Sequence, residues 1–157
     1  KILNIDYDSI KNTMKNFEGI SHRLEFVRKI SDVIYINDSK ATNLSSVIAA
    51  LNSFESPIIL LLGGKNKDSN FRQLLPHTRR HVKHIVSFGE AGGEIATVLG
   101  DAVRLKKTSS LSQAVASAHK VASPGDVVLM SPGCASFDQF KSFEHRGTKF
   151  KELVNRL

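Results

Sequence analysis

The chain has 157 residues, of which 41% are hydrophobic and 24% charged, so it can form one domain with a substantial core but not two large ones. No apolar run approaches the length of a membrane span, and the N-terminus lacks the charged-then-apolar order of a signal peptide. The single cysteine, Cys134, excludes an internal disulfide framework, which fits a reducing cytosol. Because the chain opens at Lys1 without a methionine, we expect a fragment of a longer protein.

The formal charge of +7 invites a nucleic-acid interpretation. However, the basic residues are scattered except at residues 79–84 and at Lys106-Lys107, and no aromatic residues alternate with them as in proteins that bind single strands. We therefore predict no nucleic-acid partner. Attraction to small anionic substrates would explain the charge as well as nucleic-acid binding does, and a solvated surface bias explains it best.

Apolar runs that alternate with amphipathic segments predict an α/β domain. Strands are expected at residues 24–30, 33–36, 58–62, 82–88, 102–105 and 126–130. Helices are expected from Asp6 or Asp8 to Gly19, from Thr42 or Asn43, from Phe71 to Leu75, from Gly89, from Ser109 or Ser110, and over Phe140, Phe143, Phe150 and Leu153.

This order predicts a Rossmann-like, mostly parallel sheet with right-handed crossovers and helices on both faces. Ser31-Asp32 is predicted to join the first two strands as an N-terminal antiparallel hairpin. The one domain boundary that the pattern predicts lies near Gly19.

Three polar stretches, at residues 37–43, 63–68 and 131–137, follow the carboxyl ends of predicted strands. In a parallel sheet these ends share one edge, where open α/β sheets bind their ligands. The third stretch is rich in small residues and hydroxyls, which leave room for a ligand. We therefore expect the three stretches to converge on one site.

The chain contains the motifs Ser21-His22-Arg23-Leu24-Glu25, Asn37-Asp38-Ser39-Lys40-Ala41-Thr42-Asn43, Gly63-Gly64-x-x-Lys67, Ser131-Pro132-Gly133-Cys134-Ala135-Ser136-Phe137-Asp138, Phe140, Phe143, Arg146-Gly147 and Phe150. In these motifs and their order it resembles the C-terminal domain of the Mur ligases, and within that family the members that add D-glutamate. The resemblance implies that residues 1–20 are the tail of a central ATPase domain and that residues 21–157 form the C-terminal, D-glutamate-binding domain. Sister ligases for other amino acids and folylpolyglutamate synthase share this domain plan but carry different residues at 37–43 and 131–138.

The resemblance also implies a reaction of bacterial peptidoglycan synthesis in the cytoplasm. ATP, with Mg²⁺, phosphorylates the carboxylate of UDP-N-acetylmuramoyl-L-alanine, and the amino group of D-glutamate displaces phosphate from the acyl phosphate to form an amide. The Gly-x-x-Gly-Lys-Thr/Ser phosphate loop of the central domain is absent, as are its metal ligands. The fragment alone is therefore expected to be inactive and to hold no metal, and the full protein is expected to be a monomer that binds no membrane.

Five matched positions are implied to bind D-glutamate. Lys67 would grip a carboxylate, Thr42 and Ser136 would hydrogen-bond the substrate, and Phe137 and Phe143 would line its pocket. From the residues alone, Lys67 is better interpreted as a solvated loop lysine, and Thr42 and Ser136 as helix-cap or turn hydroxyls. For Phe143, core packing is an equally good interpretation.

Four further positions are implied to contact nucleotide or reacting groups. Lys40 would stabilise charge near the acyl phosphate, and its place at a predicted helix start, unfavourable for a cation, mildly supports a functional role. Arg23 would meet phosphates or ribose, Asp38 would accept from ribose hydroxyls, and His22 would be a hinge or nucleotide contact. A surface arginine and an Asx-turn aspartate are the alternatives for Arg23 and Asp38.

The cysteine and three of the histidines give less support to a functional role. Cys134 is interpreted as a small buried residue, and His77, His81 and His84 as part of an exposed basic helix end rather than a metal site. A free-standing nucleotide-binding module stays open as an alternative, although no Gly-x-Gly-x-x-Gly follows the first strand. A nucleic-acid-binding domain is the other rival, and it would show salt-sensitive binding.

Overall fold

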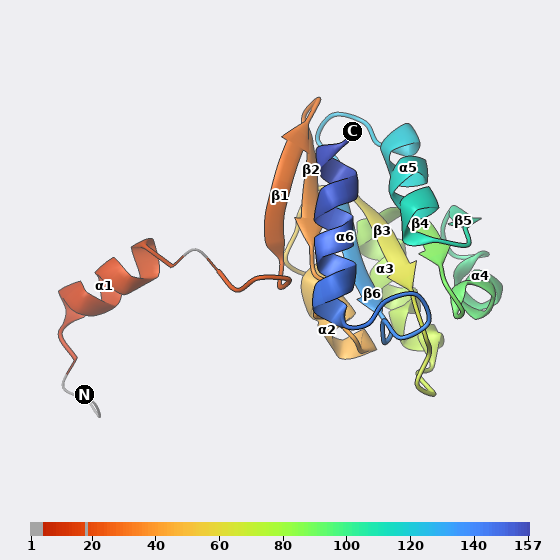
Figure 1. Ribbon diagram of the computed structural model, residues 1–157, viewed down its shortest axis with the longest axis horizontal. Coiled ribbons are helices and arrows are strands. Elements are labelled where there is room, and N and C mark those ends of the chain that lie inside the picture. The colour runs from red at the N-terminus through yellow and green to blue at the C-terminus, as the bar shows by residue number, and fades with distance from the viewer. Residues whose placement is uncertain (1–4, 18) are drawn as a thin grey trace.

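A six-stranded sheet forms the centre of the fold in the computed structural model, which describes residues 5–17 and 19–157. Its strands lie in the order β1-β2-β6-β3-β4-β5 (Figure 1). Their bounds are β1 Glu25–Ile30, β2 Val33–Asn37, β3 Ile58–Gly63, β4 Val82–Phe88, β5 Leu105–Lys107 and β6 Val127–Gly133. Only the β1–β2 pair is antiparallel among these strands, so the predicted mostly parallel sheet is confirmed.

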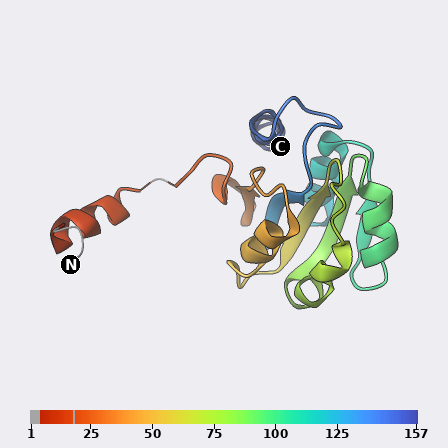
Figure 2. The same cartoon turned by 90° about the horizontal axis from the view of Figure 1, so that it is seen from below.

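Helices cover both faces of the sheet, as predicted (Figure 2). Their bounds are α1 Tyr7–Lys15, α2 Leu44–Leu51, α3 Leu75–His81, α4 Gly92–Leu99, α5 Leu111–Val121 and α6 Phe143–Asn155, with a 3₁₀ turn at Phe71–Leu74 before α3. Helices α2, α3 and α4 pack on one face around one buried apolar cluster, and α5 and α6 cover the other face around a second. Every residue of β3 and β6 is buried because these central strands are covered on both sides, which explains their continuous apolar runs.

The predicted hairpin is confirmed, and its turn has a specific backbone. Ser31 and Asp32 have φ of 48° and 63°, the mirror-image turn that matches the twist of a two-residue hairpin. Beyond the turn the register shifts between Phe26 and Arg28, so that Glu25 pairs with Asn37. This shift places the carboxylate of Glu25 beside the end of β2.

Two predicted elements lie elsewhere than expected. The edge strand β5 covers Leu105–Lys107 rather than residues 102–105. The N–H groups of Ala102 and Val103 instead bond to the carbonyl of Leu99, in a turn after α4. The short helix expected before Pro76 instead continues through it to His81, since proline in the first turn gives up an N–H that has no partner there.

The last helix also begins later than its apolar period predicts. Phe140 lies in the loop before α6, where its N–H bonds to the carbonyl of Ser136 at 2.8 Å. Helix α6 starts at Phe143 because Ser142 caps it, accepting from the N–H of His145. The loop after β6 is therefore longer than a simple strand-to-helix turn.

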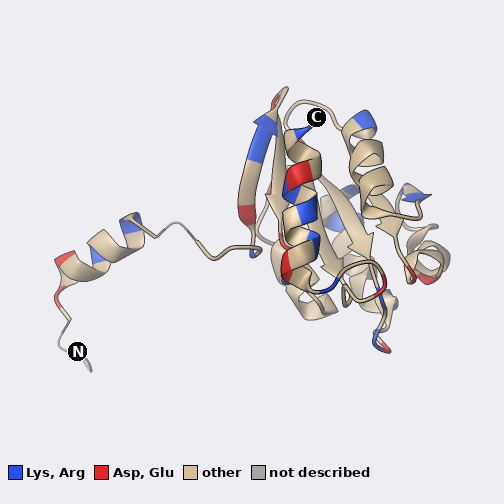
Figure 3. Cartoon of the chain, in the orientation of Figure 1, with Lys and Arg blue, Asp and Glu red and all other residues tan. Residues whose placement is uncertain are grey.

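Helix α1 stands away from the sheet in Figure 1, and no residue of it is buried. Asp6 caps it, as one of the two predicted candidates, and its apolar residues Tyr7, Ile10 and Met14 are 76%, 44% and 74% exposed. An apolar side on an uncovered helix needs another surface to be buried. Lysines and arginines lie on α1, β1, α6 and other elements in Figure 3, interspersed with acidic residues, and no described helix is long and apolar enough to cross a membrane.

Candidate functional site

The three polar loops predicted to converge do so at the carboxyl edge of the adjacent strands β2, β6 and β3. The N–H of Gly133 donates to the carbonyl of Ala41 at 2.9 Å, joining the loops after β6 and β2. Lys65 and Ala135 exchange two backbone hydrogen bonds of 2.9 and 3.0 Å, joining the loops after β3 and β6. The edge is therefore one connected backbone surface.

Gly63 and Gly64 allow this close approach. Their φ values of 148° and 128° lie where side chains are rarely tolerated. A Cβ on Gly63 would overlap the carbonyl oxygen of Phe88, and one on Gly64 would overlap that of Ala135. These two glycines thus bring the loop after β3 close to the end of β4 and to the loop after β6.

Arg146 of α6 fastens two of the loops from inside the protein. Its side chain is fully buried, and its guanidinium donates to the hydroxyl and carbonyl of Ser39 and to the carbonyl of Cys134, each at 3.0 Å. Burial lowers its pKa to about 10, so it keeps its charge at neutral pH. Sequence reasoning quoted Arg146 in a motif but gave it no role. Its spacing from Phe143 and Phe150 on the buried side of α6 was the available signal.

A pocket of about 220 Å³ opens between the segment before β1 and helix α2. It brings together three predicted residues, Arg23, Asp38 and Lys40. The rest of its lining is mostly small: Leu24, Ala41, Ser46, Ala49, Ala50 and Ser53. Arg23 and Lys40 are exposed whereas Asp38 is buried, so the pocket has two exposed cations and one buried carboxylate.

Asp38 is held by two donors. One carboxylate oxygen accepts from the hydroxyl of Ser131 at 2.7 Å and the other from the N–H of Leu24 at 3.3 Å. Burial raises the pKa of Asp38 above its ordinary value, although both hydrogen bonds and the nearby Arg23 oppose the shift. The ionised form is thus costly in the folded chain, which is typical of a carboxylate kept for binding.

Replacing Asp38 with asparagine is therefore expected to stabilise the chain at neutral pH by about 1 kcal/mol, since the amide is neutral and keeps both contacts. A raised carboxyl pKa costs stability as pH rises above the unfolded value, so the gain should vanish below about pH 3.9, where both folded and unfolded carboxyls are protonated. Urea unfolding of both proteins across pH 3 to 8 checks this. A variant less stable than the wild type at pH 7 would contradict it.

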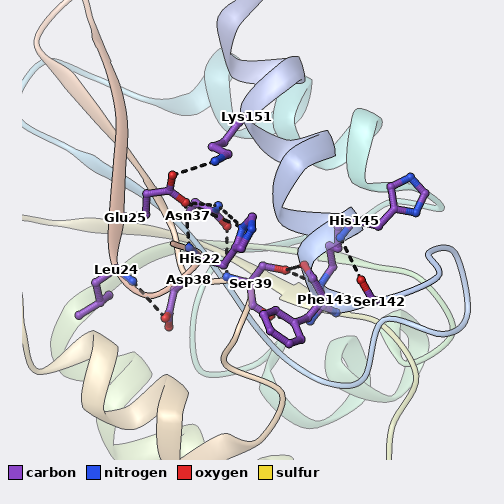
Figure 4. A network of polar contacts seen from close by, with 11 residues as sticks. His22, Leu24, Glu25, Asn37, Asp38, Ser39, Ser142, Phe143, His145 and Lys151 are labelled. Carbon is purple, nitrogen blue, oxygen red and sulfur yellow. Dashed lines mark hydrogen bonds and ion pairs between the residues drawn. The ribbon is translucent and has the colours of Figure 1, made fainter. Parts of the chain in front are cut away.

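His22 and Phe143, which lie close together in Figure 4, form a group with Lys40 of the pocket lining. His22 is buried, and its ring stands edge-on to the Phe143 ring at 6.1 Å between centroids. The Nζ of Lys40 lies 5.2 Å from the same Phe143 ring, and the N–H of Lys40 donates to the carbonyl of His22 at 3.0 Å. His22 and Leu24 both have positive φ, at 65° and 44°, so the segment before β1 follows a constrained path.

The remaining predicted residues lie along the same edge. Lys67 Nζ is 5.9 Å from the centroid of the Phe137 ring, and both side chains are exposed. Ser136 is buried within the loop after β6, and Thr42 is half-buried with its N–H bonded to the carbonyl of Lys40. No hydrogen bond or ion pair joins Lys67 to the Lys40 group in residues 5–17 and 19–157, so the edge carries two separate clusters.

Cys134 is buried, as expected, and burial raises its pKa to about 12, which leaves an unreactive thiol. His77 and His81 belong to α3 and His84 to β4. Within the described part of the chain, no three histidine, cysteine, aspartate or glutamate residues are placed to hold a metal ion.

A doubly wound sheet with polar loops gathered at the carboxyl ends of its central strands defines an α/β domain of the ligand-binding class. The family model described as "Mur ligase, glutamate ligase domain" matches residues 22–134. The chain belongs to this family.

Within this family, the chain is similar to curated proteins that share one name. The chain is 46% identical over its full 157 residues to the UDP-N-acetylmuramoylalanine--D-glutamate ligase of Chlamydia caviae and covers 38% of that protein. It is 40% identical over its full length to the ligase of the same name from Salinibacter ruber and covers 34% of it. The chain thus spans little more than a third of the length of these relatives.

Solved structures share the fold at low sequence identity. The bifunctional folylpolyglutamate synthase/dihydrofolate synthase of Yersinia pestis superimposes with a TM-score of 0.69 at 19% identity, over 97% of this chain and 35% of that one. The UDP-N-acetylmuramate-alanine ligase MurC of Thermotoga maritima gives a TM-score of 0.66 at 13% identity, over 99% and 35% of the two chains. The predicted fold class agrees with these neighbours.

Proposed function

We propose that this chain is the C-terminal domain of an ATP-dependent ligase that adds D-glutamate to UDP-N-acetylmuramoyl-L-alanine through an acyl phosphate, in bacterial peptidoglycan synthesis. The observation that carries the proposal is the gathering of the matched loops at one sheet edge, in a chain 46% identical over its whole length to a ligase named for this reaction. The full protein would work in the cytoplasm as a monomer.

Residues 21–157 would form the domain and residues 1–20 the end of a preceding ATPase domain. The exposed apolar side of α1 supports this division, because Tyr7, Ile10 and Met14 need a surface that the sheet does not provide. Isolated from that preceding domain, the chain would release no phosphate from ATP.

The pocket beside α2 would receive the nucleotide. Asp38 would accept from ribose hydroxyls with its free lone pairs, Arg23 would approach phosphate, and His22 would donate at the pocket rim. Lys40, the proposed catalytic residue, would place its ammonium near the acyl phosphate, where it stabilises charge developing in the transition state. Its contact with Phe143 already directs it toward this edge.

The cluster of Lys67 and Phe137 would bind D-glutamate, together with Thr42, Ser136 and the side of the Phe143 ring in the Lys40 group. Lys67 would pair with a carboxylate as a compact cation, Thr42 and Ser136 would hydrogen-bond the substrate, and Phe137 and Phe143 would flank it. Holding the amino group close to the acyl phosphate is the main contribution that such a domain can make to amide formation.

ATP and Mg²⁺ supply the phosphoryl group and neutralise its charge when they are bound. We place the metal on the preceding domain, since the described residues here offer no grouped ligands for it. What this chain contributes is orientation of the nucleotide, a positive charge at the reacting groups and a pocket for the amino acid.

The experiment that tests the proposal measures phosphate release from ATP by the complete polypeptide that carries this chain. With UDP-N-acetylmuramoyl-L-alanine present, release should need D-glutamate and fail with L-glutamate. Lys67→Ala should raise the KM for D-glutamate at least about tenfold, because a charge-assisted contact is lost. Lys65→Ala is the matched control, since the exposed lysine two residues earlier fastens the loop through its backbone alone.

Two other results would redirect the assignment. Release that requires a different amino acid would make this a sister ligase or a folylpolyglutamate-type enzyme, families whose fold it shares. No release with any amino acid, together with ATP binding by the chain alone, would favour a free-standing nucleotide-binding module.

A further inference from the structure

A partly buried chain of polar contacts runs from helix α6 to the ring of His22 (Figure 4). The side-chain nitrogen of Asn37 lies 3.0 Å from Nδ1 of His22 and 2.9 Å from a carboxylate oxygen of Glu25. The other oxygen of Glu25 accepts from Nζ of Lys151 at 2.8 Å. None of these three partners was assigned a role from sequence.

The orientation of the Asn37 amide follows from its neighbours. Its oxygen accepts from the N–H of Ser39 at 3.2 Å, and the carboxylate of Glu25 can only accept, so the amide nitrogen must face Glu25 and His22. Both amide hydrogens are then donated, one to Glu25 and one to Nδ1 of His22. An Nδ1 that accepts carries no proton, so the neutral ring has its proton on Nε2.

Glu25 is itself fixed in the acceptor role. Burial opposes its ionisation, but hydrogen bonds from Lys151, from the N–H of His22 and from Asn37 outweigh burial and hold its pKa below the usual range. The register shift in β1 places Glu25 opposite Asn37, and Gly147 leaves space for the ring, because any Cβ there would overlap Nδ1 of His22.

We infer that Asn37, Glu25 and Lys151 are positioning residues that hold the His22 ring with Nδ1 as an acceptor and a directed Nε2–H donor beside Lys40 and Phe143. The acceptor would be a phosphate or carboxylate oxygen bound at this edge, and only this last step rests on the proposed function. Together with the Lys40 ammonium, such a donor provides a second, uncharged contact for an oxyanion.

The tautomer can be measured without any ligand. Nitrogen-15 NMR of the imidazole rings in this 157-residue chain at pH 7 should show His22 with a protonated Nε2 and an unprotonated Nδ1, without the averaging that a mobile ring gives. His77, on the far helix α3, serves as an internal comparison. A His22 ring protonated on Nδ1, or on both nitrogens, would overturn the inference.

Two substitutions test the cause. Asn37→Asp replaces the donor with an acceptor and should move the His22 proton to Nδ1. Glu25→Gln keeps one oxygen for the N–H of His22 and for Asn37, gives up the oxygen that accepts from Lys151, and should leave the proton on Nε2. If Asn37→Asp folds and the proton stays on Nε2, Asn37 does not set the tautomer. If it does not fold, the wild-type and Glu25→Gln spectra still decide the matter.

The functional consequence is tested in the complete polypeptide by a double-mutant cycle on phosphate release. Asn37→Asp should lower kcat/KM at least about tenfold, a usual cost of losing a partner that orients an active imidazole. In a His22→Gln background the same change should cost less than about twofold, because Asn37 then has no ring to orient. Equal losses in both backgrounds would mean that Asn37 serves only the fold. If NMR shows the proton on Nε2 of His22 but the wild-type polypeptide shows no turnover, the proposed function is refuted. The inference that Asn37, Glu25 and Lys151 position the ring would still hold.

Discussion

Replacing Arg146 with methionine should lower the free energy of unfolding by about 3 kcal/mol. Methionine fills much of the same space but donates nothing, so the carbonyls of Ser39 and Cys134 stay buried without their partners. Loss of the costly buried charge offsets part of this penalty, which is why we expect about 3 kcal/mol and not the sum of three charge-assisted bonds. The shift in the urea midpoint at an unchanged slope measures the effect.

Lys149→Met is the matched control for this substitution. Lys149 lies on the same helix, one turn further along, and its exposed ammonium pairs with Glu152. Exposed pairs of this kind contribute little, so the control should change stability by less than about 0.5 kcal/mol. If the two variants were equally stable, the buried guanidinium would not hold the loops.

Arg146 also shows why part of the site escaped sequence reasoning. A search for helical periodicity uses apolar residues; of the residues it finds here, Phe150 is buried in α6 and Leu153 is partly buried. An arginine on the buried side of the helix is passed over because arginines are almost never fully buried. The burial of Arg146 is explained by the tertiary structure, because the buried carbonyls of Ser39 and Cys134, from two different loops, both need a donor at this point.

The central strands were predictable because burial on both faces leaves no room for polar residues. Runs such as those of β3 and β6 have few other interpretations. By contrast, β5 has only three residues at the sheet edge, and its place depends on how far the turn after α4 extends. That extent is set by hydrogen bonds to the carbonyl of Leu99, which no local pattern marks.

The contact between Glu25 and Asn37 is a second case in which sequence is insufficient. A regular hairpin with a two-residue turn at Ser31-Asp32 would pair Phe26 with Asn37. The irregularity between Phe26 and Arg28 moves Glu25 into that place instead. A one-residue shift reverses which side chains face the core, and here it brings a carboxylate to the imidazole network.

The largest loss of stability is expected for Gly63→Ala, about 4 kcal/mol or more. The new Cβ would overlap the carbonyl of Phe88, which is backbone of the neighbouring central strand and cannot rotate away. The same carbonyl accepts from the N–H of Gly64 at 3.2 Å, so moving it aside also breaks the bond that turns the loop after β3. Since a domain of this size has only about 5–15 kcal/mol of stability, thermal unfolding should show a transition lowered by roughly ten degrees or more.

Gly93→Ala separates this effect from the general cost of changing glycine. Gly93 lies in α4 with ordinary helical backbone, and a Cβ there would meet nothing closer than the Lys107 ammonium at 3.9 Å. Alanine is the better helix former, so this variant should gain about 0.5–1 kcal/mol. Because the clash in Gly63→Ala is with the chain's own strand, its loss should appear without any ligand. A Gly63→Ala chain as stable as the wild type, but defective in binding D-glutamate, would mean that the glycine serves the ligand and not the fold.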